Sequence, residues 1–459
     1  MNRNQLIFID KWLKDANRKP LVIRGARQVG KSTLVKLAAE QLNLPLALIN
    51  LERFPELNAS FQSLDLRAII NELEALPGIG DLAPNSLLFL DEIQAVPEAI
   101  PALRYFYEDM PEIPLLSAGS LLEFVLSDHK FSMPVGRVQY LHMGPMTFTE
   151  FLEALGEIKL KNEIDTYELG KDIGLVVHQR LSKLLRSYYF VGGMPEAVAA
   201  FVRSQKFKEV SAVHHSIIDT YRDDFPKYAG ARNLSRMVNV FNFAARNVGK
   251  KVKYSNISKH DQSATIKKDI ELLCMARVVS KVIHSHCSGL PLQADLEETV
   301  FKLLFLDVGL MNSISGLNLS AISQMEDIQL INEGPIAEQF IGQHLQALLS
   351  SSLNRELTYW LREGKASNAE TDFVVSFDGR IIPIEVKSGS SGSLKSLHQF
   401  VGEKQVSTAI RFDGCMPSTQ RVNTSIQKAG RRIDVDYHLI SLPLYLVERL
   451  PELIETLPR

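Results

Sequence analysis

The chain has 459 residues, of which 45% are apolar and 23% charged, and its formal net charge is −2. A single hydrophobic core rarely extends over so long a chain, so roughly two to four domains are expected. A net charge near zero excludes a protein that coats nucleic acid through bulk positive charge, and any DNA contact would have to come from a local basic patch.

Cysteines and apolar runs indicate the compartment. Cys274, Cys287 and Cys415 are odd in number, far apart and without metal-ligand spacing, which favours unpaired thiols in a reducing cytosol. Residues 1–15 alternate apolar and charged side chains as an amphipathic helix does, without the core of a signal peptide. No run approaches the ~20 apolar residues of a membrane span. We therefore expect a cytoplasmic protein without a membrane partner.

The first motif with chemical meaning is GARQVGKST at residues 25–33, between a strand-like run at 20–23 and a helical stretch at 33–40. Its glycines would let backbone N–H groups turn toward a phosphate, and the helix would present its positive N-terminus. Lys31 would reach the β- and γ-phosphates of ATP, and the Ser32 hydroxyl would bind Mg²⁺. Arg27 would reach a phosphate or point to water. The predicted nucleotide-binding residues are Gly25, Arg27, Gln28, Val29, Gly30, Lys31, Ser32 and Thr33.

A second motif, LLFLDEIQ at residues 87–94, predicts a buried parallel strand with two carboxylates at its carboxyl end. Ligands collect at that edge in open α/β sheets. Asp91 would hold Mg²⁺ through water, and Glu92 would orient and polarise the attacking water. The alternative, a buried strand that happens to end in Asp-Glu, is disfavoured by the phosphate-loop pattern upstream.

Two further residues are candidates for the same site. A strand at residues 113–120 would bring Ser117 or Ser120 to the γ-phosphate or the water, and Ser120, after Gly119, is preferred. The alternative is that Ser120 caps a helix at 121–126. Arg137 would neutralise transition-state charge in its own chain or, if subunits assemble, across a subunit boundary; the alternative is a solvated loop residue.

At this point the chain resembles the AAA+ class of ATPases. More closely, it is similar to a prokaryotic family that joins such a P-loop core to a C-terminal domain long labelled as of unknown function. The resemblance spans essentially the whole chain and implies an ATP hydrolase. Its marks are RGARQVGKST, LFLDEIQ, SAGS, GRV with PMTFTEFL, YYFVGGMPEAV, TYRDDFPKY, FLDVGLMN and IPIEVKSG.

The middle of the chain is predicted to be helical at first. Apolar residues in 148–155 follow helical spacing, and residues 145–230 predict a helical lid over the nucleotide. Residues 231–318 predict a helix, a short helix, a third helix at 263–273 and two strands at 278–284 and 299–306, the order of a winged helix. Between Arg246 and Lys268 there are seven Lys and Arg against one acid, Asp261. The third helix would enter a major groove of DNA, or the lysines are solvated and the domain packs on the core.

The C-terminal part carries a second constellation of polar residues. Glu385 and Lys387 are two apart in a predicted strand, so both project from one face, and Asp372 opens the adjacent strand. Two carboxylates and a lysine at a common strand end could bind Mg²⁺ and activate water against a phosphodiester, with Glu338 completing the metal shell. Glu370 would be an extra ligand or a solvent-facing residue.

This layout resembles the restriction-endonuclease-like (PD-(D/E)xK) fold, and specifically archaeal Holliday-junction resolvases. The resemblance implies that Asp372 and Glu385 are metal ligands and that Lys387 stabilises the nucleophile or transition state. Residues 331–440 contain twelve basic and twelve acidic residues, so no cationic trough indicates DNA.

The sequence as a whole predicts an α/β multidomain protein. Its parts would be a P-loop NTPase core at 1–144, a helical lid at 145–230, a winged helix at 231–318 and a restriction-endonuclease-like domain at 319–459. The preferred function is an ATPase that uses ATP and Mg²⁺ to regulate DNA handling, with Mg²⁺-dependent cleavage by Lys387 and its metal ligands. The alternative is a nucleotide-controlled protein-interaction or signalling switch whose nuclease-like domain is inactive.

Overall fold

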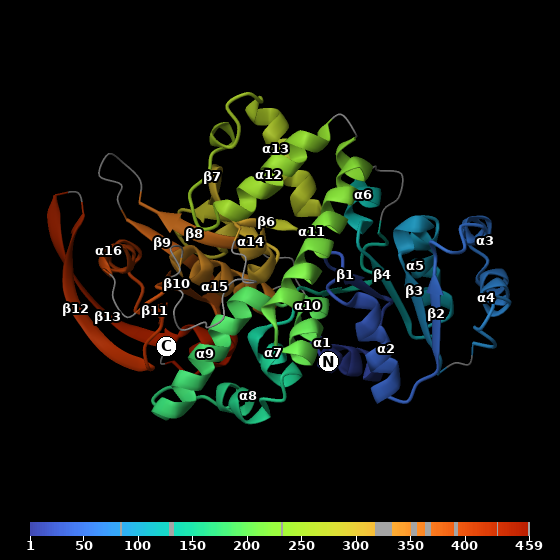
Figure 1. The fold of residues 1–459 in the computed structure, drawn as a ribbon, viewed down its shortest axis with the longest axis horizontal. Helices are drawn as coiled ribbons and strands as arrows, with labels where there is room; N and C mark the ends of the chain where they lie inside the picture. Colours follow the sequence, from blue (N-terminus) through green and yellow to red (C-terminus); the bar gives the residue numbers. More distant parts are fainter. Residues whose placement is uncertain are drawn as a thin grey trace. The chain divides into compact units, whose positions relative to one another are not determined.

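The computed structural model describes residues 1–82, 85–127, 133–230, 233–316, 333–349, 356–362, 369–389, 393–428 and 430–457. It groups into two compact units. Unit 1 contains Met1–Gly144 and Met275–Arg277, and unit 2 contains Pro145–Cys274, Val278–Leu349 and Arg355–Arg459. Each unit has its own sheet (Figure 1). Within the described ranges, no helix is both long and apolar enough to cross a membrane.

Unit 1 is built on a five-stranded parallel sheet with the order β2-β3-β4-β1-β5. The third predicted strand therefore lies between the strands that carry the two nucleotide motifs. The carboxyl ends of β1, β3 and β4 share one edge of the sheet, so residues that follow them meet there. The strands are β1 (Leu21–Arg24), β2 (Leu46–Asn50), β3 (Leu87–Asp91), β4 (Leu115–Gly119) and β5 (Gln139–His142).

Helices complete the core of unit 1. The central strands β3 and β4 are buried at every residue, as expected for a parallel sheet covered on both faces. Phe61, Ile69, Leu90 and Phe106 belong to one hydrophobic cluster beneath the helices. The helices are α1 (Gln5–Lys14), α2 (Lys31–Gln41), α3 (Leu57–Ser63), α4 (Leu66–Glu74), η1 (Ile93–Ala95), α5 (Ala99–Asp109) and α6 (Leu122–Ser127).

Unit 2 begins with a run of helices, as predicted. Glycine and proline separate α9 from α10 at residues 192–195, where the sequence pattern is broken. Apolar faces give these helices a shared aromatic core that includes Phe151, Tyr188 and Phe201. The run consists of α7 (Phe148–Ala154), α8 (Ile158–Asp165), α9 (Leu175–Val191), α10 (Pro195–Ser204), α11 (Phe207–Ala229), α12 (Leu234–Arg246), η3 (Tyr254–Asn256) and α13 (Ser263–Met275).

The second half of unit 2 is an eight-stranded mixed sheet with the order β12-β13-β11-β10-β9-β8-β6-β7. Its strands are β6 (Val279–Ser285), β7 (Leu296–Phe305), β8 (Leu357–Leu361), β9 (Glu370–Phe377), β10 (Arg380–Val386), β11 (Thr408–Asp413), β12 (Ser418–Lys428) and β13 (Arg431–Pro443). The accompanying helices are η4 (Leu292–Asp295), α14 (Val308–Ile314), α15 (Glu333–Leu349), α16 (Lys395–Lys404), η7 (Leu444–Arg449) and α17 (Leu450–Glu455).

The sheet of unit 2 runs across the predicted boundary at residue 318. The helix, short helix, helix and two antiparallel strands expected at 231–318 are present as α12, η3, α13, β6 and β7. However, β6 also pairs in parallel with β8 of the predicted C-terminal domain, through Val282, Ile283 and His284. The two strands of the expected wing are thus also the edge of the larger sheet, which lies within a single compact unit.

Candidate active site

The loop between β1 and α2 has the backbone that the glycine pattern predicts. Gln28 (φ 62°) and Gly30 (φ 94°) adopt left-handed conformations just before the helix begins at Lys31. The first helical hydrogen bond runs from the N–H of Leu34 to the carbonyl of Gly30, at 2.9 Å. In any α-helix the N–H groups of the first turn have no carbonyl partner within the helix, and in α2 these N–H groups lie beside the loop. That arrangement suits a phosphate group.

Gly25 also packs closely against a neighbouring backbone segment. A Cβ at this position would lie 2.2 Å from the carbonyl oxygen of Met143, which follows β5. Glycine is therefore required for close packing of the loop on that backbone. Arg27 is partly buried and Gln28 exposed, while Val29 is buried and Thr33 lies on an exposed face of α2.

Lys31 lies inside the loop. Its Nζ donates hydrogen bonds to the carbonyls of Gly25 (3.1 Å) and Ala26 (2.9 Å). Burial lowers the pKa of Lys31 to about 8, although the nearby Glu92 and Asp91 carboxylates raise it. A buried ammonium of this kind is favoured further by any anionic ligand placed beside it.

Ser32 and Asp91 bring together the two motifs. The Ser32 hydroxyl donates a 2.6 Å hydrogen bond to Oδ2 of Asp91, and the Glu92 N–H donates to Oδ1. Burial raises the pKa of Asp91, and the bond from Ser32 opposes this shift. A hydroxyl and a carboxylate in contact are hard oxygen donors of the kind that Mg²⁺ prefers, so these residues fit that ion.

Glu92 is oriented by two polar side chains. Its Oε2 accepts hydrogen bonds from Gln94 Nε2 (2.5 Å) and Ser120 Oγ (3.4 Å). Ser120 therefore lies beside Glu92 and hydrogen-bonds to it, and its contact with the γ-phosphate or the water stays a prediction. Gln94 was not singled out from the sequence, although it ends the LFLDEIQ motif. A Cβ at Gly119 would lie 2.3 Å from Oε1 of Gln94, so this glycine makes room for it.

Arg137 lies away from these residues. It precedes β5, at the amino end of a strand parallel to β1, whereas the loop follows the carboxyl end of β1. Its Nε donates a 2.7 Å hydrogen bond to Glu108 of α5, and this contact raises the pKa of the guanidinium. The position does not support action on the same chain's phosphates, and action across a subunit boundary stays a prediction.

Arg3 is a supporting residue that sequence reasoning missed. Its guanidinium is buried and donates to the carbonyls of Val29 (2.9 Å) and Gly144 (2.8 Å). It thereby holds the phosphate-loop backbone against the segment after β5. No pattern around Arg3 indicates this, because its partners are backbone atoms 26 and 141 positions away.

The carboxylates predicted in unit 2 surround a buried lysine. Lys302 of β7 is 1% exposed, and its Nζ lies 2.8 Å from Glu338, 2.7 Å from Glu370 and 3.4 Å from Asp372. Burial raises the pKa of Glu338 to about 8, although Lys302 opposes the shift. The three carboxylates hold the pKa of Lys302 well above its ordinary value against the effect of burial. Glu370, left open from the sequence, thus pairs with a lysine inside the unit.

The remaining predicted residues lie beside this group, which we call the Lys302 cluster (Lys302, Glu338, Glu370 and Asp372). Asp372 Oδ2 accepts the N–H of Val386, and Lys387 Nζ donates to Glu385 at 2.6 Å. Burial raises the pKa of Glu385 to about 7, with Asp372 adding to the shift. Among the described residues, the single group of three metal-type ligands within 4.8 Å of one another is His284, His286 and Glu297, outside this cluster.

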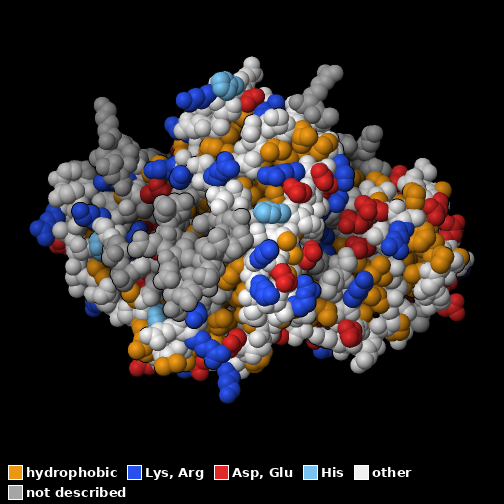
Figure 2. Space-filling view, viewed as in Figure 1, with side chains coloured by type: hydrophobic (Ala, Val, Ile, Leu, Met, Phe, Trp, Pro, Cys, Tyr) orange, Lys and Arg blue, Asp and Glu red, His pale blue; other side chains and the backbone are white. Residues whose placement is uncertain are grey.

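The basic segment of unit 2 is solvent-exposed. All seven Lys and Arg between Arg246 and Lys268 are exposed, and Figure 2 shows Lys and Arg gathered over the region of α12 and α13. Lys251 pairs with Glu370 at 3.0 Å and Lys267 with Glu271 at 3.8 Å. Part of the positive charge is therefore matched within the unit.

Comparison with known proteins places the first motif pair in a family. Residues 17–152 match a family model described as an AAA domain. Those residues contain the phosphate loop, the Ser32–Asp91 contact and Glu92. Residues 17–152 form a P-loop ATPase domain of the AAA type.

Two later segments of the chain match family models without an assigned function. Residues 182–321 and 333–429 each match a domain of unknown function, and no curated protein matches the chain. Two solved structures are similar at low TM-scores. The Walker-type ATPase Paby2304 of Pyrococcus abyssi is 16% identical, with TM-score 0.44, covering 68% of this chain and 95% of its own. The Thermotoga maritima RuvB Holliday junction branch migration motor is 15% identical, with TM-score 0.28, covering 61% and 89%. Neither likeness carries an argument about this chain.

Proposed function

We propose that the AAA domain hydrolyses ATP with Mg²⁺. The main support for this proposal is the 2.6 Å contact between Ser32 and Asp91, beside the buried Lys31. Ser32 and Asp91 would hold the ion, Asp91 through water, and Lys31 would meet the β- and γ-phosphates. The bound ion would neutralise charge on the phosphates.

Glu92 would orient the attacking water. Gln94 and Ser120 donate to a single oxygen, Oε2, which leaves Oε1 to accept a hydrogen bond from water. Because both donors are neutral, they fix the carboxylate without removing its negative charge. A water so held is positioned for in-line attack on the γ-phosphate.

We further infer that ATP turnover serves a nucleotide-controlled switch whose nuclease-like domain does not cleave DNA. This inference is supported by the Lys302 cluster, where an ammonium lies among the carboxylates expected to hold Mg²⁺. An ammonium at 2.8 Å from Glu338 neutralises part of the charge that would attract a divalent ion.

The second candidate is ATP-regulated DNA handling, with cleavage by Asp372, Glu385 and Lys387. It is favoured by the adjacent strands that bring these residues together and by the exposed lysines over α12 and α13. Displacement of Lys302 by Mg²⁺ would be required, since the lysine now contacts Asp372.

One experiment separates the two candidates. ATP hydrolysis is measured with Mg²⁺ alone and with single-stranded, duplex or four-way-junction DNA, and cleavage is followed in the same tubes. The switch predicts turnover that no DNA changes and no cutting by wild type. DNA-stimulated turnover, with cutting that Lys387→Ala abolishes, would establish the second candidate. Absence of turnover under every condition would contradict the ATPase proposal itself.

A further inference from the structure

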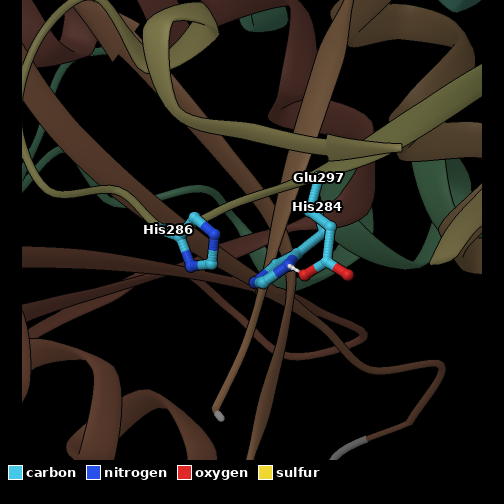
Figure 3. A group of neighbouring side chains, drawn as sticks. All are labelled: His284, His286 and Glu297. Carbon is cyan, nitrogen blue, oxygen red and sulfur yellow. Dashed lines mark ion pairs between the residues drawn. The ribbon is translucent and has the colours of Figure 1, made fainter. Parts of the chain in front are cut away.

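A compact group of two histidines and one glutamate lies at the end of the β6–β7 pair, apart from the residues considered so far. His284 and His286 are separated by one residue at the end of β6, and Glu297 of β7 is the cross-strand partner of His284. Figure 3 shows the two rings beside each other and the Glu297 carboxylate directed at His284. The ring centroids are 5.0 Å apart, and one ligand atom from each residue lies within 4.8 Å of the others.

The hydrogen bond on the far side of His284 requires a hydrogen on Nε2. Its Nε2 lies 3.2 Å from the carbonyl oxygen of Leu361 in β8. A carbonyl can only accept, so Nε2 carries the hydrogen and Nδ1 is left to face Glu297. Metal-binding histidines characteristically donate their other N–H to a carbonyl or carboxylate in this way.

The space between His284 and Glu297 suits a cation. Nδ1 of His284 lies 3.5 Å from Oε2 of Glu297, longer than a hydrogen bond between such atoms. Ligand atoms held about 2.0–2.2 Å from a tetrahedral Zn²⁺ lie about 3.2–3.6 Å apart. The observed separation matches that spacing, and small rotations of the more exposed His286 and Glu297 would complete the set.

We propose that His284, His286 and Glu297 bind a first-row divalent metal ion of the Zn²⁺ type, with a further position open to solvent. Two imidazole nitrogens and one carboxylate select such ions over Mg²⁺ and Ca²⁺, which prefer oxygen ligands. The site is therefore chemically distinct from the Mg²⁺ site proposed in the AAA domain.

Cys287 is not part of this set, although it follows His286 directly. Its thiol donates to the carbonyl of Ser285 and belongs to a hydrophobic cluster with Trp360 and Phe400. Cys287 lies beyond the end of β6 and has a left-handed backbone (φ 52°), so its thiol contacts different neighbours from the histidines. A bound ion would tie β6 to β7 directly and to β8 through the carbonyl of Leu361.

The test is a Zn²⁺ titration of the untagged full chain, stripped with a chelator and then titrated in competition with a chromophoric chelator. Wild type is expected to bind one Zn²⁺ per chain, and excess Mg²⁺ should not displace it. His286→Ala and Glu297→Gln should each weaken binding at least about tenfold, since even outer-shell changes have effects of that size. Both side chains are partly exposed, so the fold should persist, which circular dichroism checks.

Two variants serve as matched controls. Glu298→Gln alters the exposed neighbour of Glu297 on the same strand, and His260→Ala removes an exposed histidine elsewhere in unit 2. Both should bind Zn²⁺ as wild type does. The proposal is overturned if wild type binds no stoichiometric Zn²⁺. That result is expected if His284 and Glu297 form only an imidazolium–carboxylate ion pair. The proposal is equally overturned if His286→Ala and Glu297→Gln bind as tightly as the controls.

Discussion

At the scale of single residues, Glu92 is the carboxylate that we propose to orient the attacking water. Its backbone is left-handed (φ 53°), and its Oε2 is held by Gln94 and Ser120. Non-glycine residues rarely adopt this conformation, and such strain is often found at functional sites. The turn directs the side chain back over the carboxyl edge of the sheet, beside Asp91.

Glu92→Gln should therefore preserve ATP binding and reduce turnover by about 10²–10⁴-fold, because the amide cannot polarise water as the carboxylate does. Steady-state phosphate release and binding of a fluorescent ATP analogue provide the two readings. Glu40→Gln, on the exposed face of α2, is the control and should hydrolyse ATP normally. Wild-type turnover in Glu92→Gln would show that another residue positions the water.

Lys31→Ala should abolish ATP binding. The change removes the buried positive charge at the start of α2 and with it the bonds to the carbonyls of Gly25 and Ala26. Equilibrium binding of the same analogue measures the loss, with Lys36→Ala on α2 as a control. Unchanged affinity in Lys31→Ala would refute the assigned nucleotide site.

The residues of the proposed nucleotide site could be named from the sequence because their signals are local. Lys31 and Ser32 belong to a nine-residue motif, and Asp91 and Glu92 directly follow a buried strand. Lys302 could not be found in this way. It is one lysine in the apolar second half of β7, and its partners Glu338 and Asp372 are 36 and 70 positions away. Only the fold brings them together.

At the scale of elements, the Lys302 cluster joins β7, α15 and β9. Lys302→Met should leave three partly or fully buried carboxylates without their cation and reduce unfolding free energy by about 3–5 kcal/mol. Urea denaturation at pH 8 measures the loss, and Lys267→Met on the exposed face of α13 is the control. Adding Glu338→Gln should recover part of the stability, because it removes one unpaired charge. No recovery would argue against the pairing of Lys302 with Glu338.

The amino end of α7 is satisfied by side chains from two distant elements. Thr147 and Glu150 form a capping box, the N–H of Phe148 donates to Nε2 of His344, and that of Thr149 donates to Glu448. These bonds use donors that a helix leaves unpaired in its first turn. The PMTFTEFL motif is therefore explained by the docking of α7 on α15 and η7, a structural role that the sequence alone did not show.

This junction should make stability depend on pH through Glu448. Burial raises its pKa to about 7, so the folded protein binds more protons than the unfolded chain between about pH 4.5 and 7. Stability from this group is therefore lost as the pH rises through that window. Glu448→Gln removes the ionisation and should gain about 3 kcal/mol relative to wild type between pH 4.5 and 8.

Urea denaturation of wild type and Glu448→Gln at both pH values measures this difference. Glu452→Gln, an exposed residue of α17, should track wild type at each pH. A constant difference between Glu448→Gln and wild type across the window would show that Glu448 titrates normally.

At the scale of the whole molecule, the sheet of unit 2 determines what can fold alone. A fragment of residues 319–459 lacks β6 and β7 and so exposes the edge of β8 and leaves the carboxylates without Lys302. We expect it to be unfolded or aggregated, whereas residues 145–459 should give a cooperative unfolding transition. Circular dichroism with thermal melting distinguishes them. A cooperatively folded 319–459 fragment would restore the predicted boundary.

The order of elements was predictable and their grouping was not. Apolar periodicity gives α13 and the two strands after it to within a few residues, because it depends on near neighbours in the chain. Parallel pairing of β6 with β8 joins strands separated by a long stretch that includes α14 and α15. Apolar periodicity does not identify the strand with which a segment pairs. Two strands that form a wing and two strands at the edge of a larger sheet therefore show the same sequence pattern.

The parallel pairing of β6 with β8 has a consequence for inheritance. Recombination near residue 318 would deliver the last strands to a new protein without the lysine that neutralises their carboxylates. The smallest segment that could move between genes with both the pairing of β8 and the charges of its carboxylates matched begins no later than β6. Relatives that retain only the final third of the chain lack Lys302. They should supply another cation for these carboxylates or have neutral residues in their place.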